Sequence, residues 1–207
     1  DAKEQDIQVL AVSHQNLLAH NPYFTEGFLI HRAQELEALY EKYDVMANLS
    51  GHIHIQHIED SGLPEILTSA LPVSPHHYGI LEFDGKTLDY QAKILDVASW
   101  AREQGLIDQN LLDFSQASRA FIEQVSARKL ESELLDSQLT SLERELLLQT
   151  FAQINADYFA GRQIDPANHQ QGLSLMQETG LSFYLTYIDS ILKSAEKGHE
   201  SFQLELE

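Results

Sequence analysis

Residues 45–56 read VMANLSGHIHIQ, and this stretch decides the predicted fold. Its apolar first half predicts a buried strand, which ends at the Ser-Gly pair. His52 and His54 follow two residues apart, so in an extended segment both imidazoles point to the same side. Neutral imidazoles at the end of a core strand are suitable ligands for transition metals. A histidine pair on the surface of a strand end is the alternative interpretation of this tripeptide.

A second stretch, IQVLAVS at residues 7–13, has the same design and is followed by His14. Between the two strands, apolar and aromatic residues recur at the spacing of a helix: Leu29, Ala33, Leu36, Tyr40 and Tyr43. The pattern predicts a β-α-β unit, whose parallel strands lie side by side or nearly so. Because ligands bind at the carboxyl ends of such strands, we expect His14, His52 and His54 at one edge of the sheet.

Together the two histidine blocks resemble the last two metal-binding blocks of the calcineurin-like metallophosphoesterases, which include purple acid phosphatases and bacterial cyclic-nucleotide phosphodiesterases. The resemblance rests on Ser13-His14 and on Ser-Gly-His-Ile-His about 40 residues later, and it covers residues 7–95. It implies that His14 and His52 bind one metal of a dinuclear centre and His54 the other. The implied cofactors are two divalent transition metal ions (manganese, iron or zinc) in the full-length protein.

The family's earlier blocks carry a bridging aspartate, an asparagine ligand and the catalytic histidine, and they have no counterparts in this sequence. We therefore expect the chain to be the C-terminal portion of a longer metal-dependent phosphoesterase. In that enzyme, metal-activated water would hydrolyse a small phosphomonoester, phosphodiester or cyclic nucleotide. The portion itself should hold no catalytic residue and be inactive alone.

The expected partner of this portion is the upstream N-terminal half of the same protein. Without that half, strands 7–13 and 45–49 should lack neighbours in the sheet. Open strand edges pair readily with other chains, so self-association of the portion is also expected.

Composition limits the function further. The formal net charge of −19 over 207 residues argues against a nucleic-acid groove, because few basic side chains remain to replace counterions. No stretch approaches the roughly 20 apolar residues of a membrane span. The sequence contains no cysteine, which excludes disulfides and thiolate metal ligands. Localisation stays open between a bacterial cytoplasm and a cell surface or secreted protein.

Other histidines carry weaker predictions. His20 lies in the loop 15–28 beside the expected site and is a weak candidate for contacting substrate. His31 is expected to face solvent. His57 lies an odd number of residues beyond His54, so we treat it as structural.

Residues 55–95 show strand signals. Segments 55–59 and 65–70 predict two strands, and Asp84-Gly85 between two alternating runs predicts a β-hairpin at 78–95. With the resemblance, residues 1–96 are expected to form the C-terminal part of a metallophosphoesterase β-sandwich flanked by helices. The predicted fold class is therefore α/β (α+β).

Residues 97–207 show helical signals and predict a C-terminal α-helical bundle. Thr140 and Glu143 form a capping box, and Asp165-Pro166 begins a further helix. The expected core stripes are Leu111, Phe114, Phe121 and Val125 in one helix, Leu147, Phe151, Ile154 and Tyr158 in the next, and Tyr184, Ile188, Ile191 and Ala195 in the last, which should end near Gly198.

Two other functions fit the same residues. The helical part could be an interaction module for which the β part is only a structural base. Alternatively, His14, His52 and His54 could form a mononuclear three-histidine metal site with one open position, as in catalytic zinc sites.

Overall fold

The computed structural model describes residues 2–5, 7–135 and 137–206. The chain divides into two compact units: unit 1 comprises residues 1–71, 77–93 and 199–207, and unit 2 comprises residues 72–76 and 94–198. The predicted boundary near residue 96 lies close to the start of the main helical segment. Strand β7 (Ser201–Glu205) departs from the prediction of helix for this part of the chain, and it belongs to unit 1.

The first sheet of unit 1 contains the predicted β-α-β unit. Strand β1 (Val9–Val12) pairs in parallel with β2 (Val45–Ser50), and helix α1 (Ala33–Lys42) connects them. β2 also pairs in parallel with β4 (Glu65–Leu67), which runs antiparallel to β3 (His57–Glu59). The order is β1-β2-β4-β3, and a short 3₁₀ helix η1 (Lys3–Gln5) precedes β1. The expectation that both histidine-bearing strands lack neighbours is wrong for β2, which is flanked on both sides, while β1 lies at the edge.

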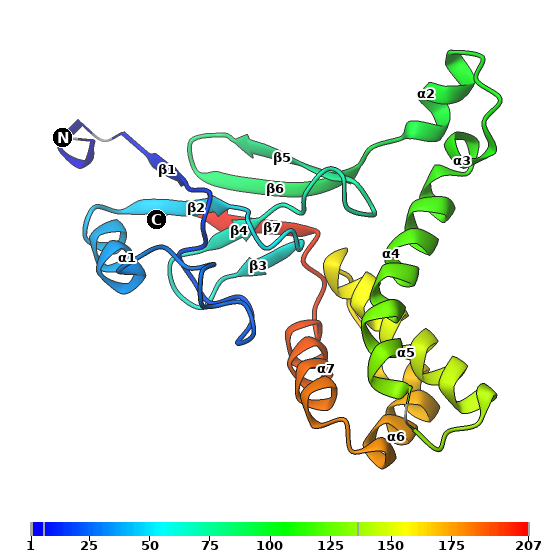
Figure 1. Cartoon of the computed structure of the whole chain (residues 1–207). Helices are drawn as coiled ribbons and strands as arrows, with labels where there is room; N and C mark the ends of the chain where they lie inside the picture. The colour runs from blue at the N-terminus through cyan, green and yellow to red at the C-terminus, as the bar shows by residue number, and fades with distance from the viewer. Residues whose placement is uncertain (1, 6, 136, 207) are drawn as a thin grey trace. The chain divides into compact units, whose positions relative to one another are not determined.

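The second sheet has the order β5-β6-β7 and contains the predicted hairpin. β5 (His77–Phe83) and β6 (Thr87–Ile94) are joined by a turn in which the Asp84 carboxylate accepts hydrogen bonds from the backbone N–H groups of Lys86 and Thr87, both at 2.8 Å. Gly85 adopts a φ of 95°, which favours glycine. β7 (Ser201–Glu205) pairs antiparallel with β6 and lies beside it in Figure 1.

The two sheets of unit 1 share one hydrophobic core. Ile58 and Ile66 of the first sheet pack with Tyr90 of the second, and all three are nearly inaccessible to solvent. The half-buried residues around them also come from both sheets: Leu49, Leu81, Ala92 and Phe202. Unit 1 is therefore a small two-layer sandwich, and the fold class α+β is confirmed.

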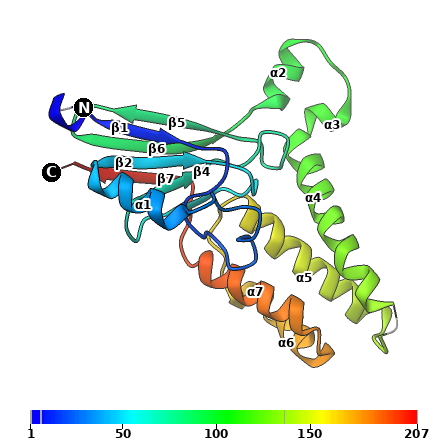
Figure 2. The ribbon, with the colours of Figure 1, turned by 60° about the vertical axis from the view of Figure 1, so that its left-hand side comes forward.

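Unit 2 is the predicted helical part. Its elements are α2 (Val97–Glu103), α3 (Gln109–Leu112), α4 (Phe114–Glu131), η2 (Ser132–Leu134), α5 (Ser141–Phe159), η3 (Pro166–His169), α6 (Gln170–Thr179) and α7 (Ser182–Ser194). The capping box of α5 is present, and the Asp165 carboxylate caps η3, which begins with Pro166. Helix α5 lies beside α4, α6 and α7 (Figures 1 and 2).

The core of unit 2 follows the prediction in two of three helices. The α5 stripe and the α7 residues Ile188 and Ile191 are buried. In α4 the prediction is wrong, because Phe121 is 67% exposed and Val125 is 38% exposed. Ser126 and Leu130 are the buried residues of α4, so this helix turns a different face toward the interior.

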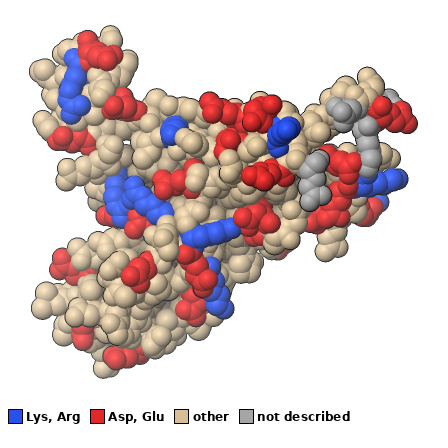
Figure 3. Space-filling view, turned by 180° about the vertical axis from the view of Figure 1, so that it is seen from behind, with Lys and Arg blue, Asp and Glu red and all other residues tan. Residues whose placement is uncertain are grey.

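Acidic side chains are spread over the face shown in Figure 3, in keeping with the net charge. No helix within the described ranges is long and apolar enough to cross a membrane.

Candidate functional site

The site is built where β1 and β2 end. The register pairs Val12 with Leu49, so the two parallel strands finish level with each other. The backbone pairing continues beyond the strands, because Gly51 N–H donates to the His14 carbonyl at 3.2 Å. This brings His14 Nε2 to 2.9 Å from His52 Nδ1, with the ring centroids 4.8 Å apart. Two of the three predicted histidines thus meet at one sheet edge.

The backbone after β2 is not extended. His52 has a φ of 68° and His54 a φ of 61°, both in the left-handed region. The alternation argument that placed these two histidines on one side of an extended segment is therefore wrong. Ile53 and Ile55 are buried while His54 is exposed, so the apolar side chains on either side anchor this turn to the interior of unit 1.

The loop between β1 and α1 is fastened to the end of β2. The Asn16 amide donates to Ser50 Oγ at 3.0 Å and to the Gly51 carbonyl at 2.9 Å. The backbone N–H of the buried Asn16 also donates a hydrogen bond to the Phe28 carbonyl. The Phe28 ring in turn packs against the His52 ring, with the centroids 5.2 Å apart. One asparagine therefore links both strand ends and helps to hold the histidine pair in place.

Glu65 is a fully buried carboxylate at the start of β4. Its Oε1 accepts hydrogen bonds from Leu17 N at 2.8 Å, Asn48 Nδ2 at 2.7 Å and Ser50 Oγ at 2.6 Å. Its Oε2 accepts from Leu18 N at 2.5 Å and lies 3.1 Å from His20 Nε2. Burial raises the pKa of the Glu65 carboxyl, but the hydrogen bonds from His20, Leu17 and Ser50 outweigh it and the pKa lies below its ordinary value.

His20 lies in the interior instead of facing a substrate from the loop. It is 4% exposed, and its Nδ1 is 2.8 Å from Nδ1 of the buried His57, which stacks on His199 at 3.9 Å. A carboxylate only accepts, so His20 donates from Nε2 to Glu65, and in the neutral ring its Nδ1 accepts from His57. The burial of His20 gives no support to its predicted substrate contact, which stays a prediction, and His57 is buried in the same cluster.

Sequence reasoning did not find the role of Glu65. The available signal was an acidic residue directly after Leu63-Pro64 at the first position of an apolar strand. A lone carboxylate at the first position of a strand is equally consistent with a residue that faces solvent. Only the parallel pairing of β4 with β2 places it under the loop and makes it an acceptor for five donors.

The histidine pair has the spacing of two metal ligands. Imidazole nitrogens that bind one ion at about 2.0–2.1 Å in adjacent positions lie roughly 2.8–3.4 Å from each other. The 2.9 Å between His14 Nε2 and His52 Nδ1 is the length of a hydrogen bond between the two rings, and it also falls within that range. Across the residues that the structure describes, no group of three or more His, Asp or Glu could hold a metal ion. The mononuclear three-histidine alternative and the dinuclear assignment both stay predictions.

Comparison with known proteins adds one match. Residues 96–198 match the family model described as the C-terminal domain of cyclic nucleotide phosphodiesterase. That range is almost the whole of the long segment of unit 2, and the match supports a function related to phosphodiesterases. It does not reach residues 7–95, so their resemblance to calcineurin-like metallophosphoesterases stays a prediction. No curated protein matches the chain.

Proposed function

We propose that this chain is part of a metal-dependent phosphodiesterase and that His14 and His52 supply two ligands to one metal of its dinuclear centre. The 2.9 Å approach of the two imidazoles at the carboxyl edge of parallel strands carries the proposal. Independent support comes from unit 2, because the matching family domain belongs to cyclic nucleotide phosphodiesterases.

The donor set is suited to manganese, iron or zinc. His14, His52 and His54 would hold part of a two-ion centre, which would supply polarisation of the phosphate and activation of water. His54 is the proposed ligand of the second ion, and its exposed side chain is accessible to it. The remaining ligands and the catalytic histidine would come from protein outside this sequence, as the resemblance implies.

The residues behind the site act by positioning. Glu65 fixes the loop at Leu17 and Leu18 and the end of β2 at Ser50 with a single buried side chain. Asn16 connects the same loop to Gly51. His14 and His52 are thereby held before any ion binds, which reduces the ordering that metal binding requires.

A phosphodiester, and a cyclic nucleotide in particular, is the proposed substrate class. The description of the matching family names that class, whereas the sequence resemblance alone leaves monoesters and diesters open.

Zinc titration of the chain, followed by NMR of the histidine ring protons, tests the metal ligands. The signals of His14 and His52 should shift together, and His14→Ala or His52→Ala should remove the shift of the remaining partner. The exposed His31 provides the control, because His31→Ala should leave the titration unchanged. Equal shifts for exposed histidines and for the pair would refute the proposed ligand pair.

An activity measurement tests the reaction. The chain alone, with manganese, should not hydrolyse bis-p-nitrophenyl phosphate, while a longer protein that supplies the remaining ligands should do so. In that longer protein, His52→Ala should abolish turnover and His31→Ala should not. Turnover by the chain alone that disappears in His52→Ala would contradict the need for further ligands.

A further inference from the structure

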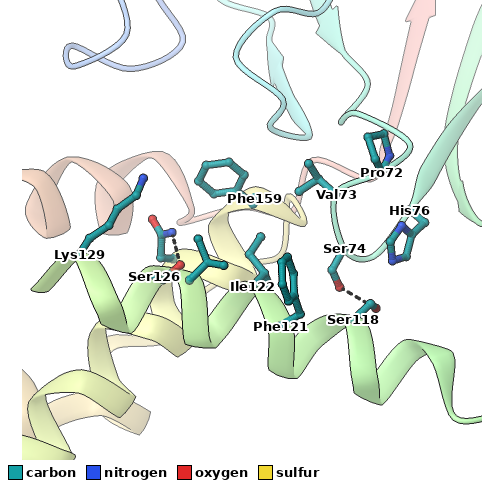
Figure 4. Close-up of a pocket in the computed structure, with 12 residues that line it drawn as sticks. Pro72, Val73, Ser74, His76, Ser118, Phe121, Ile122, Ser126, Lys129 and Phe159 are labelled. Carbon is teal, nitrogen blue, oxygen red and sulfur yellow. Dashed lines mark hydrogen bonds between the residues drawn. The ribbon is translucent and has the colours of Figure 1, made fainter. Parts of the chain in front are cut away.

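Unit 2 contains a cavity of about 230 Å³ that the proposed reaction does not use. It is lined by α4, the end of α5 and the 72–76 loop, all within unit 2 (Figure 4). Its walls are mainly apolar, with Phe121, Ile122 and Val125 from α4, Phe159 from α5 and Val73 from the loop.

The α4 wall includes a row of side chains at helical spacing. Phe121, Val125 and Lys129 follow one another at intervals of four, so they lie on one side of the helix. The first two are exposed apolar residues at positions where the periodicity predicts core. Both residues line the cavity, so part of its apolar wall is open to solvent.

One end of the cavity carries hydrogen-bond donors. Lys129 lies there as the last member of the exposed row, and Figure 4 shows its side chain extending from α4 beside Ser126. The hydroxyl of the buried Ser126 accepts a hydrogen bond from Asn155 Nδ2 at 2.8 Å, which leaves its own proton for another acceptor. Asn155 is held in turn by the Tyr187 hydroxyl, which donates to its Oδ1 at 2.7 Å.

These features select an amphipathic anion. The apolar walls favour a ring or short aliphatic chain, while Lys129 and Ser126 favour a negative group at one end. An apolar cavity of about 150 Å³ holds benzene, so 230 Å³ admits a ring with a short acidic side chain. The chain has 32 acidic and 13 basic residues, so an anion finds few cationic side chains on it other than Lys129.

We propose that this cavity of unit 2 binds a small monocarboxylate with a ring-sized apolar body, of the arylalkanoate class. The site is separate from the histidine pair in unit 1 and needs no metal. Binding of a monocarboxylate in this cavity can therefore be confirmed or refuted independently of the proposed phosphodiesterase activity.

The probe is 4-phenylbutyrate, with 4-phenylbutanol as its uncharged analogue, titrated into the whole chain and followed by amide NMR. Phenylbutyrate should bind with a Kd on the order of 1 mM and perturb amides around Val125 and Phe159. The alcohol should bind about two- to fivefold more weakly, because it lacks the charge that pairs with Lys129.

Matched variants test the two ends of the cavity. Phe121→Ala should weaken phenylbutyrate binding about tenfold, whereas Phe183→Ala, which removes an exposed aromatic from α7, should not. Lys129→Met should remove the preference for the acid over the alcohol, and Lys193→Met should preserve it. Val125→Trp, at a partly exposed position that tolerates a larger side chain, should fill the cavity and abolish binding.

Three results would overturn the proposal. The first is the absence of cavity perturbations at 10 mM phenylbutyrate in folded protein, roughly ten times the expected Kd. The second is equal binding of acid and alcohol. The third is a concentration-dependent dimer that Phe121→Ala dissociates, which would make this face a contact between two copies of the chain.

Discussion

Glu65→Gln should destabilise unit 1 far more than a conservative change of one atom suggests. Glu65 Oε1 accepts three hydrogen bonds and Oε2 two. A glutamine with its oxygen in the Oε1 position keeps three acceptor contacts, but its NH₂ group then faces the backbone N–H of Leu18. That hydrogen bond is lost, and His20 must change tautomer to accept from the amide.

The magnitude follows from these contacts. A hydrogen bond to a charged group contributes about 1.5–3 kcal/mol, and a buried donor left without an acceptor costs about 1–3 kcal/mol. With the charge removed, the three retained contacts also weaken. We expect the free energy of unfolding of unit 1 to fall by about 3–5 kcal/mol. For a domain of roughly 100 residues, the lower value corresponds to a decrease in Tm of about 12–24 °C.

Hydrogen exchange of the β2 and β4 amides measures this loss in unit 1 specifically. The matched control is Glu59→Gln, because Glu59 pairs in register with Glu65 on the neighbouring strand but accepts only an exposed hydrogen bond from Ser61 N at 3.2 Å. The control should change stability by less than about 0.5 kcal/mol. Equal effects of the two substitutions would refute the view that Glu65 organises the sheet edge.

Three further predictions concern stability. The folded pKa of Glu65 lies below the ordinary 4.5, so its contribution to stability is present above that pH and is lost as pH falls through the folded pKa. The free energy of unfolding of unit 1 should therefore fall less steeply with acid in Glu65→Gln, and equal slopes against pH would contradict this. A Cβ at Gly172 of α6 would overlap the Thr150 side chain of α5, so Gly172→Ala should lower the free energy of unfolding of unit 2 by about 1–3 kcal/mol in urea titrations. Most of that loss should be absent in a Thr150→Ala background, and a neutral Gly172→Ala would disprove the tight packing. Arg119→Met should lower the free energy of unfolding of unit 2 by about 1 kcal/mol, because Arg119 Nη1 lies 2.6 Å from Asp157 Oδ1 in a partly exposed ion pair. A double-mutant cycle with Asp157→Asn that gives no coupling energy would argue against the pair.

The sequence was sufficient for features encoded in neighbouring residues. The apolar runs before His14 and His52, with a helical pattern between them, predicted parallel strands with both histidines at one edge. The Asp84-Gly85 turn and the capping box of α5 depend on contacts two or three residues apart, and both were predicted.

Features that depend on distant contacts were missed. β7 is five residues long and follows more than 100 residues after the strand it pairs with, so its short alternation had no recognisable partner. His54 lies between the buried Ile53 and Ile55, and the positive φ values of His52 and His54 take this turn out of the extended conformation. Phe121 has the periodicity of a core residue, and only the face that α4 turns to α5 shows that it lines a cavity.

The position of β7 makes the two units depend on each other for stability through the chain itself. β6 and β7 are neighbours at the point where the helical segment leaves and returns, with Ala92 N–H donating to the Glu200 carbonyl at 2.8 Å. If unit 2 unfolds, β6 and β7 are joined by a flexible segment of about 100 residues, and closing that loop costs chain entropy. A molecule that stabilises unit 2 should therefore also stabilise the pairing of β6 with β7. Protection of the β7 amides would then depend on whether the helices of unit 2 are folded.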